Sequence, residues 1–139
     1  MASRESPPDP QRIDAVGPTA LGDAVAWARR YASDHDLGAR DVARLCLIVE
    51  ELVTNLIEHG SLGDLTIGIE LARRPADLAL VVEDNGRPFD PRNAEHQDAV
   101  PVRGGGAGLR LIAAWSEVVG YASENGRNRL ELSLSLSDS

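Results

Sequence analysis

The 139-residue sequence predicts a two-layer α/β sandwich, in which helices cover one face of a mixed, mainly antiparallel sheet. Three observations predict this fold class. Two stretches in the first half have apolar residues at helical spacing. Two later pairs of segments alternate between apolar and polar residues, and each pair is joined by a short turn. A long irregular segment separates these two pairs. Consecutive hairpins favour antiparallel pairing, so the helices are expected to cover the single apolar face of the sheet.

The helical pattern predicts two helices before the first strand. The first extends from Thr19 to about His35, and Gly38 follows as a stop signal. The second begins at about Asp41 and continues to Gly60. Its apolar residues form one stripe, which is typical of a helix packed on a sheet.

The strand pattern predicts four strands in two hairpins. The sequence RRPAD provides the turn of the first hairpin, and Asn125-Gly126 provides the turn of the second. The last strand alternates leucine with polar residues, so one of its faces is expected to be buried. The predicted strands are residues 65–71, 78–83, 116–121 and 127–136.

The remaining segments complete the predicted organisation. Residues 1–11 are polar and proline-rich, and we expect a disordered lead-in to one domain at 12–139. Residues 85–106 have almost no apolar rhythm, which is typical of a functional lid or a disordered segment. A short helix is expected at 107–115. The order is thus helix, helix, strand, strand, long loop, helix, strand, strand.

Composition excludes several classes of function. The net charge of −8 argues against a general binder of nucleic acids or anionic membranes. All 14 basic residues are arginine, so no lysine is present for a lysine-dependent phosphate loop or a Schiff base. The single cysteine, Cys46, lies in an apolar helical pattern and is expected to be a buried structural thiol. No apolar run is long enough to span a membrane, and no segment resembles a secretory signal, so a cytoplasmic location is expected.

The second predicted helix has a polar stripe on a mostly apolar surface. Glu51, Asn55 and His59 lie four residues apart and therefore share one face. A carboxylate and an amide oxygen on one face suit Mg²⁺ coordination and proton abstraction. Taken alone, the same spacing is more typical of a solvated helix surface.

Two further motifs contain glycine. Asp84 ends a strand and is followed by Gly86, so its carboxylate could accept a hydrogen bond from the amine of a flat ligand. Alone, this motif is more typical of a turn. The second motif, RGGGAGLRLI at 103–112, opens directly into a helix, where unhindered backbone N–H groups can bind an anion. Alternatively, these glycines could form the hinge of a lid. The dinucleotide-binding fingerprint is excluded, because these glycines do not follow a first strand.

Together, and in this order, the three motifs resemble those of the GHKL ATPase superfamily. EELVTNLIEHG resembles its N-box, EDNGRPFDP its first glycine box and GGGAGLRLI its second. The form of the N-box, the segment Pro-Phe-Asp-Pro and the ending ENGRNRLELSLSL resemble the bacterial anti-sigma-factor serine kinases most. The resemblance covers about residues 12–136 and implies a Bergerat-type ATP-binding fold.

The resemblance also implies a role for each matching residue. Glu51 would be the general base, Asn55 would coordinate Mg²⁺ bridging the ATP phosphates, and Asp84 would bind the adenine amine with Gly86 beside the ring. His59 would support the lid or the phosphates. The second glycine box would hold the phosphates and hinge a lid at 87–105. Its expected nucleotide contacts are Gly104, Gly105, Gly106, Gly108 and Leu109.

Two features of the lid depart from the pattern of the resembled family. Pro88 occupies a position where many relatives have a second glycine, so the entry to the lid is expected to be stiffer. The lid also contains acidic residues beside its arginines, and only the arginines would favour a triphosphate; the residues are Asp90, Glu95, Asp98, Arg87, Arg92 and Arg103. Of these, Arg103, beside the glycines, is a candidate phosphate contact on electrostatic grounds alone.

The resemblance implies a protein serine/threonine kinase that uses ATP and Mg²⁺ and phosphorylates an anti-anti-sigma partner of the STAS fold. The alternative is an ATP-gated module that sequesters its partner, such as a sigma factor, with little or no kinase turnover. Retention of Glu51 favours the kinase, because nucleotide binding alone needs no base. A two-component histidine kinase is disfavoured, since no helical hairpin with a phospho-accepting histidine is present. The resemblance further implies a homodimer.

Overall fold

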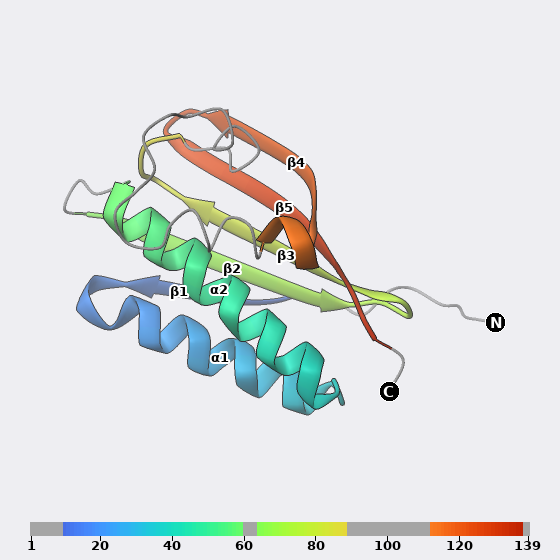
Figure 1. The fold of residues 1–139 in the computed structure, drawn as a ribbon. Coiled ribbons are helices and arrows are strands. Elements are labelled where there is room, and N and C mark those ends of the chain that lie inside the picture. The colour runs from blue at the N-terminus through green and yellow to red at the C-terminus, as the bar shows by residue number, and fades with distance from the viewer. Residues whose placement is uncertain (1–9, 60–63, 89–111, 138–139) are drawn as a thin grey trace.

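The computed structural model describes residues 10–59, 64–88 and 112–137. The elements in these ranges form a sheet with two long helices against it (Figure 1). A short 3-10 turn at Gly17–Thr19 connects the first strand to the first helix. The strands are β1 (Gln11–Val16), β2 (Thr66–Arg73), β3 (Asp77–Asp84), β4 (Glu117–Glu124) and β5 (Arg127–Ser135), and the long helices are α1 (Ala20–Asp34) and α2 (Ala39–His59).

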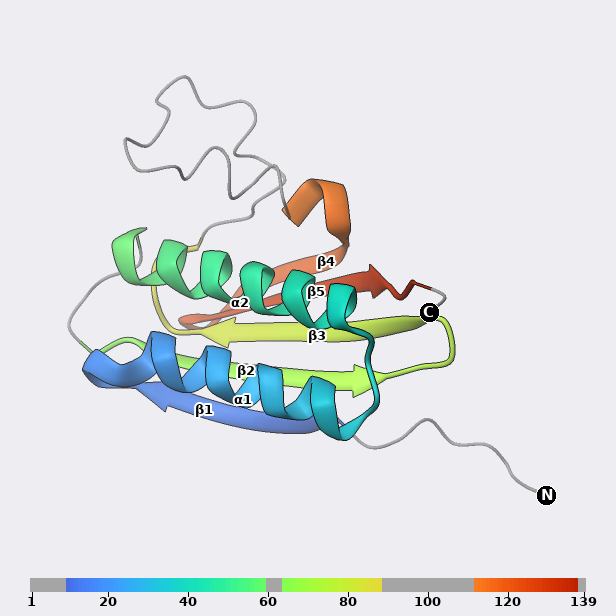
Figure 2. The same cartoon turned by 60° about the horizontal axis from the view of Figure 1, so that its bottom comes forward.

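The sheet has five strands in the order β1-β2-β3-β5-β4, and all four of its pairings are antiparallel. Figure 2 shows α1 and α2 together on one face of this sheet. The predicted fold class is therefore confirmed. The chain skips one position in the sheet, because β5 returns to lie between β3 and β4. This return brings the start of β5 beside the end of β3, where Asp84 lies.

The core lies between the helices and the sheet. Alternate residues of each central strand face the helices, so Ile69 of β2, Leu80 of β3 and Leu132 of β5 are each 1% exposed or less. From α2, Leu45 and Ile48 pack into the same core and are fully buried. The apolar stripe predicted for the second helix therefore covers the sheet.

The first strand is the element that the sequence pattern did not predict. β1 is short and mostly polar, and its Gln11 falls in the predicted lead-in. Its pairing with β2 through six residues provides the partner that holds it in the sheet. On the helix side, Ala15 is buried and Ile13 packs against the core, so only alternate residues contribute apolar contacts.

The second hairpin turns where the sequence predicts it. Asn125 and Gly126 both have positive φ, 53° and 76°. This backbone matches the two-residue turns whose twist suits antiparallel strands, and it favours glycine because a side chain is strained there. Cys46 is buried, as predicted, and burial raises the pKa of its thiol, so the reactive thiolate is disfavoured.

A network of ion pairs crosses the face of the sheet that faces away from the helices. Arg12 of β1 contacts Glu70 of β2 and Glu83 of β3, each at 2.8 Å, and Arg129 of β5 contacts Glu83 at 2.8 Å. Arg12 reaches across β2 because Gly68 has no side chain. A Cβ at Gly68 would lie 2.0 Å from the Arg12 Nη2 atom. The network therefore links four strands on this face.

The beginning of α2 is attached to the segment after β5. Asp41, in the first turn of α2, is 7% exposed. Its carboxylate accepts hydrogen bonds from the Ser137 backbone N–H at 3.0 Å and from the Ser137 hydroxyl at 2.7 Å. These contacts satisfy a buried charge and join the helix layer to the last strand of the sheet.

Candidate functional site

A buried carboxylate ends the third strand. Asp84 continues the alternation of β3, so its side chain faces the helix layer and is 4% exposed. The backbone N–H of Gly86 donates to Asp84 Oδ1 at 2.8 Å, which turns the chain directly after the strand. Asp84 and Gly86, both predicted site residues, are thus joined at one strand end.

An asparagine to which the sequence analysis assigned no role lies against this carboxylate. Asn128 of β5 pairs in register with Asp84 and is 3% exposed. Its Nδ2 atom donates to Asp84 Oδ1 at 2.8 Å and to the Gly86 carbonyl at 2.9 Å. Its Oδ1 atom accepts from the Ser123 hydroxyl of β4 at 2.6 Å. Asn128 therefore ties the ends of three strands together.

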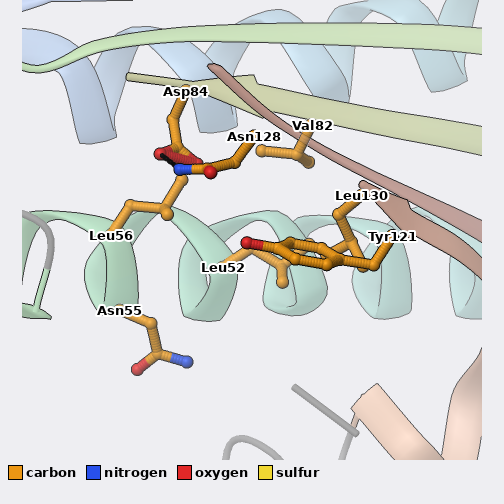
Figure 3. A pocket seen from close by; sticks show the side chains of 8 residues that line it. All are labelled: Leu52, Asn55, Leu56, Val82, Asp84, Tyr121, Asn128 and Leu130. Atoms are coloured by element: carbon orange, nitrogen blue, oxygen red, sulfur yellow. Dashed lines mark hydrogen bonds between the residues drawn. The ribbon is translucent and has the colours of Figure 1, made fainter. Parts of the chain in front are cut away.

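These groups lie at one end of a pocket between α2 and the sheet. Figure 3 shows its lining side chains, with Asn128 against the Asp84 carboxylate and the apolar side chains around them. Apolar walls with a few fixed polar groups are typical of sites for flat organic ligands. The lining residues are Leu52, Asn55, Leu56, Val82, Asp84, Tyr121, Asn128 and Leu130.

The polar stripe of α2 begins at this pocket. Asn55 lines the pocket and is 5% exposed, and its Nδ2 atom has no hydrogen-bond partner among the described residues. A buried donor without a partner is costly, and a ligand that supplies an acceptor would remove this cost. Asn55 thus has the character of a binding residue rather than of a structural one.

Glu51 lies one helical turn before Asn55 and is partly buried. Desolvation by burial is the main cause that raises the pKa of its carboxyl group, and the negative charges of Glu58 and Glu50 act in the same direction. The Asn55 amide acts against this increase, although its Nδ2 completes no hydrogen bond with a described residue. A carboxylate with a raised pKa is a better proton acceptor than an ordinary one.

The oxygen donors present fit Mg²⁺ only together with a phosphate ligand. No group of three or more histidine, cysteine or acidic side chains that could hold a metal ion is found in the part of the chain that the structure describes. Mg²⁺ is commonly held by one or two protein oxygens and completed by substrate phosphates and water. Asn55 Oδ1 is the protein oxygen that would hold the ion here.

The other predicted site residues cannot be compared with the structure. His59 ends α2, and its side chain lies outside the described residues, as do Arg103, Leu109 and the glycines between them. Of the predicted lid, only residues 87 and 88 are described. The short helix that follows is described from 112 to 115, where Ile112 is buried and Trp115 lies under the Arg44 guanidinium of α2, 5.2 Å from its ring centre. This end of the helix is therefore anchored on α2.

The comparison with protein families identifies the domain. The model of the histidine kinase-like ATPase domain matches residues 15–134, most of the chain. The chain belongs to this family. ATP binding and an activity of the ATPase or kinase type follow from the membership of this ATPase domain. No curated protein matches the sequence.

Three solved structures share the fold of the ATPase domain at low sequence identity. The RsbU and RsbW domains of Rv1364c from Mycobacterium tuberculosis match with a TM-score of 0.63 and 19% identity. This match covers 98% of the present chain, which spans only 35% of the Rv1364c chain. The histidine kinase AdeS of Acinetobacter baumannii matches with a TM-score of 0.52 and 17% identity, covering 91% of this chain and 68% of that one.

The third structure is the catalytic domain of the histidine kinase ThkA, with a TM-score of 0.54 and 12% identity. It covers 93% of this chain and 99% of that one, so the catalytic domain of a kinase and the present ATPase domain have about the same extent. None of the described helices has the length and apolarity needed to cross a membrane.

Proposed function

We propose that this ATPase domain is an anti-sigma regulatory kinase, which transfers the γ-phosphate of ATP to a serine or threonine of a STAS-type anti-anti-sigma partner. The observation that carries the proposal is the pairing of Glu51 with Asn55. A group suited to take a proton lies one helical turn from a group suited to hold the metal, and Asn55 lines the same pocket as Asp84.

The nucleotide would lie across the pocket with its two ends fixed by different elements. Asp84 at the end of β3 would accept a hydrogen bond from the adenine amine, and the apolar walls from Val82 and Leu130 would contact the ring. The phosphates would extend towards Asn55 and the glycines at 104–108. Asn55 Oδ1 would hold Mg²⁺ together with the nucleotide, and the ion would supply charge neutralisation.

These groups account for each bond and proton that changes place in the transfer step. The hydroxyl oxygen of the partner attacks the γ-phosphorus, a new oxygen–phosphorus bond forms, and the bond to the β–γ bridging oxygen breaks. The hydroxyl proton moves to the Glu51 carboxylate, and ADP leaves with the bridging oxygen. Burial of Glu51 favours this proton transfer because it raises the pKa of the acceptor.

The likeness to a structure that contains an RsbW domain supports an anti-sigma role for the proposal. The partners in this proposal are the STAS-type protein as substrate and a sigma factor as the sequestered protein. The domain is proposed to act as a homodimer, which analytical ultracentrifugation would test.

A phosphorylation assay with the cognate STAS-type protein tests the kinase. In Glu51→Ala, transfer is expected to fall by at least about 100-fold, the scale of a lost general base, while ATP binding measured by calorimetry persists. Glu117→Ala, which removes an exposed carboxylate from β4, is the matched control and keeps both activities. In Asp84→Ala, both ATP binding and transfer are lost, because the adenine contact is removed.

Two outcomes would contradict the proposal at different levels. If the wild type binds Mg²⁺ and ATP but never phosphorylates its partner, the domain is instead the sequestering module described above. If Glu51→Ala retains transfer, Glu51 is not the base.

A further inference from the structure

We infer that Asn128 makes the pocket selective for adenine over guanine, because it occupies one oxygen of Asp84 and, among the residues that the structure describes, only the other oxygen is left without a donor. This inference rests on the proposed nucleotide site. It assigns a specificity-determining role to a residue outside all three sequence motifs. The argument depends on the orientation of the Asn128 amide, on the hydrogen bonds of Asp84 and on the edges of the two bases.

The orientation of the Asn128 amide is fixed by its three partners. One side of the amide faces two acceptors, the Asp84 carboxylate and the Gly86 carbonyl, at 2.8 and 2.9 Å. The other side faces the Ser123 hydroxyl at 2.6 Å, which can donate to an oxygen. The opposite orientation would place an oxygen against two acceptors, so only Nδ2 can point towards Asp84.

The two oxygens of Asp84 are therefore inequivalent. Oδ1 accepts from Asn128 Nδ2 and from the Gly86 backbone N–H, each at 2.8 Å, and both its acceptor directions are used. No described residue donates to Oδ2. Since Asp84 lines the pocket and is 4% exposed, Oδ2 is the acceptor left for a ligand.

A single acceptor oxygen suits adenine and not guanine. Adenine presents one donor on its six-membered ring, the amine, and this amine can donate to Oδ2. Guanine presents two adjacent donors, the ring N–H and the exocyclic amine, which together match both oxygens of a free carboxylate. In this site Oδ1 already accepts two hydrogen bonds, so the two donors of guanine would either share Oδ2, which weakens both bonds, or leave one buried donor unpaired.

Calorimetric titration with ADP and GDP in the presence of Mg²⁺ tests the inference, because the diphosphates avoid turnover. We expect the wild type to bind ADP at least about tenfold more tightly than GDP, since an unpaired buried donor carries a cost of that scale. Equal affinities for ADP and GDP would overturn the inference, while a failure to bind either nucleotide would overturn the proposed ATP site as well.

Substitutions of Asn128 then distinguish an effect on nucleotide selectivity from a general disturbance of the site. In Asn128→Ala, Oδ1 loses one of its two donors, and the ratio of ADP affinity to GDP affinity is expected to fall by at least about fivefold, the scale of one hydrogen bond. Asn128→Thr keeps a donor hydroxyl at this position and is expected to retain the preference for ADP. Ser133→Ala is the matched control. Ser133 lies further along β5, where its hydroxyl donates to Asp77 of β3, and its loss leaves the ratio unchanged.

The ratio distinguishes this role from a structural one. If Asn128→Ala weakens ADP and GDP equally, Asn128 only supports the strand ends, and the specificity role is wrong. If Asn128→Ala does not fold, as judged by circular dichroism, the wild-type ratio and the comparison of Asn128→Thr with the wild type still decide the question.

Discussion

The surroundings of Glu51 raise the pKa of its carboxyl group. Glu51 lies on α2 between a buried helix face and solvent, and both burial and two nearby carboxylates disfavour its charged form. In the proposed transfer step Glu51 must be deprotonated before it accepts a proton, so its pKa would set the lower limit of the working pH range.

We therefore expect the transfer rate to fall on acidification with a midpoint above 4.5, the ordinary value for glutamate. Glu58→Gln removes one of the repelling charges, so the pKa of Glu51 decreases and the midpoint moves to lower pH. Rates measured from pH 5 to 8 for both proteins check this. Glu117→Gln, on β4, is the control and leaves the midpoint in place, and a Glu58→Gln profile identical to the wild-type profile would contradict the prediction.

At the scale of residues, the sequence predicts the candidate site residues that lie within one short motif. Glu51 and Asn55 share a helix face, and Asp84 ends a strand, so each is visible in a short motif. Asn128 lies in the family-like ending ENGRNRLELSLSL, but no role could be assigned to it there, because its contact with Asp84 depends on the pairing of β5 with β3, and the two residues are 44 positions apart. The available signal was a polar residue on the face of β5 that otherwise carries leucine.

At the scale of elements, the alternation and turn signals predict β2, β3, β4 and β5 to within a few residues. The position of β5 between β3 and β4 could not be predicted, since hairpin signals specify only which neighbours along the chain pair. β1 could not be predicted either. Its edge position, with few buried residues, leaves it without an apolar pattern, and its ion pairs become apparent only when the sheet is assembled.

Gly68 permits the ion pairs of β1, and this contact gives a prediction for the sheet. Gly68→Ala would place a Cβ 2.0 Å from the Arg12 guanidinium, so Arg12 must move away from Glu70 and Glu83. We expect the free energy of unfolding in urea to fall by about 1 kcal/mol, the scale of such pairs at a sheet surface.

The same substitution should have another effect when Arg12 is absent. In the Arg12→Ala background no guanidinium occupies the space, and alanine is favoured over glycine within a strand, so Gly68→Ala is expected to be neutral or stabilising. An equal loss of stability in both backgrounds would show that the cost comes from β2 itself rather than from Arg12.

At the scale of the whole molecule, the contact between Asp41 and Ser137 joins the helix layer to the end of the sheet. Asp41→Ala leaves the Ser137 backbone N–H and hydroxyl without their acceptor, and we expect the free energy of unfolding to fall by about 2 kcal/mol. Ser137→Ala keeps the backbone hydrogen bond and should cost about half as much. Urea unfolding of both variants checks the order, and equal stability of Asp41→Ala and the wild type would contradict it.

The central position of β5 also affects how the domain forms during synthesis on the ribosome. The chain emerges with β3 well before Arg127–Ser135, so one edge of β3 stays unpaired, and Asp84 has no Asn128 beside it, until the final strand is made. An open strand edge is also a site where another chain can pair, so this edge of β3 stays exposed to association until β5 is made and covers it. A product that ends before Arg127 therefore keeps an open edge on β3 and lacks the amide of Asn128 that holds the Asp84 carboxylate.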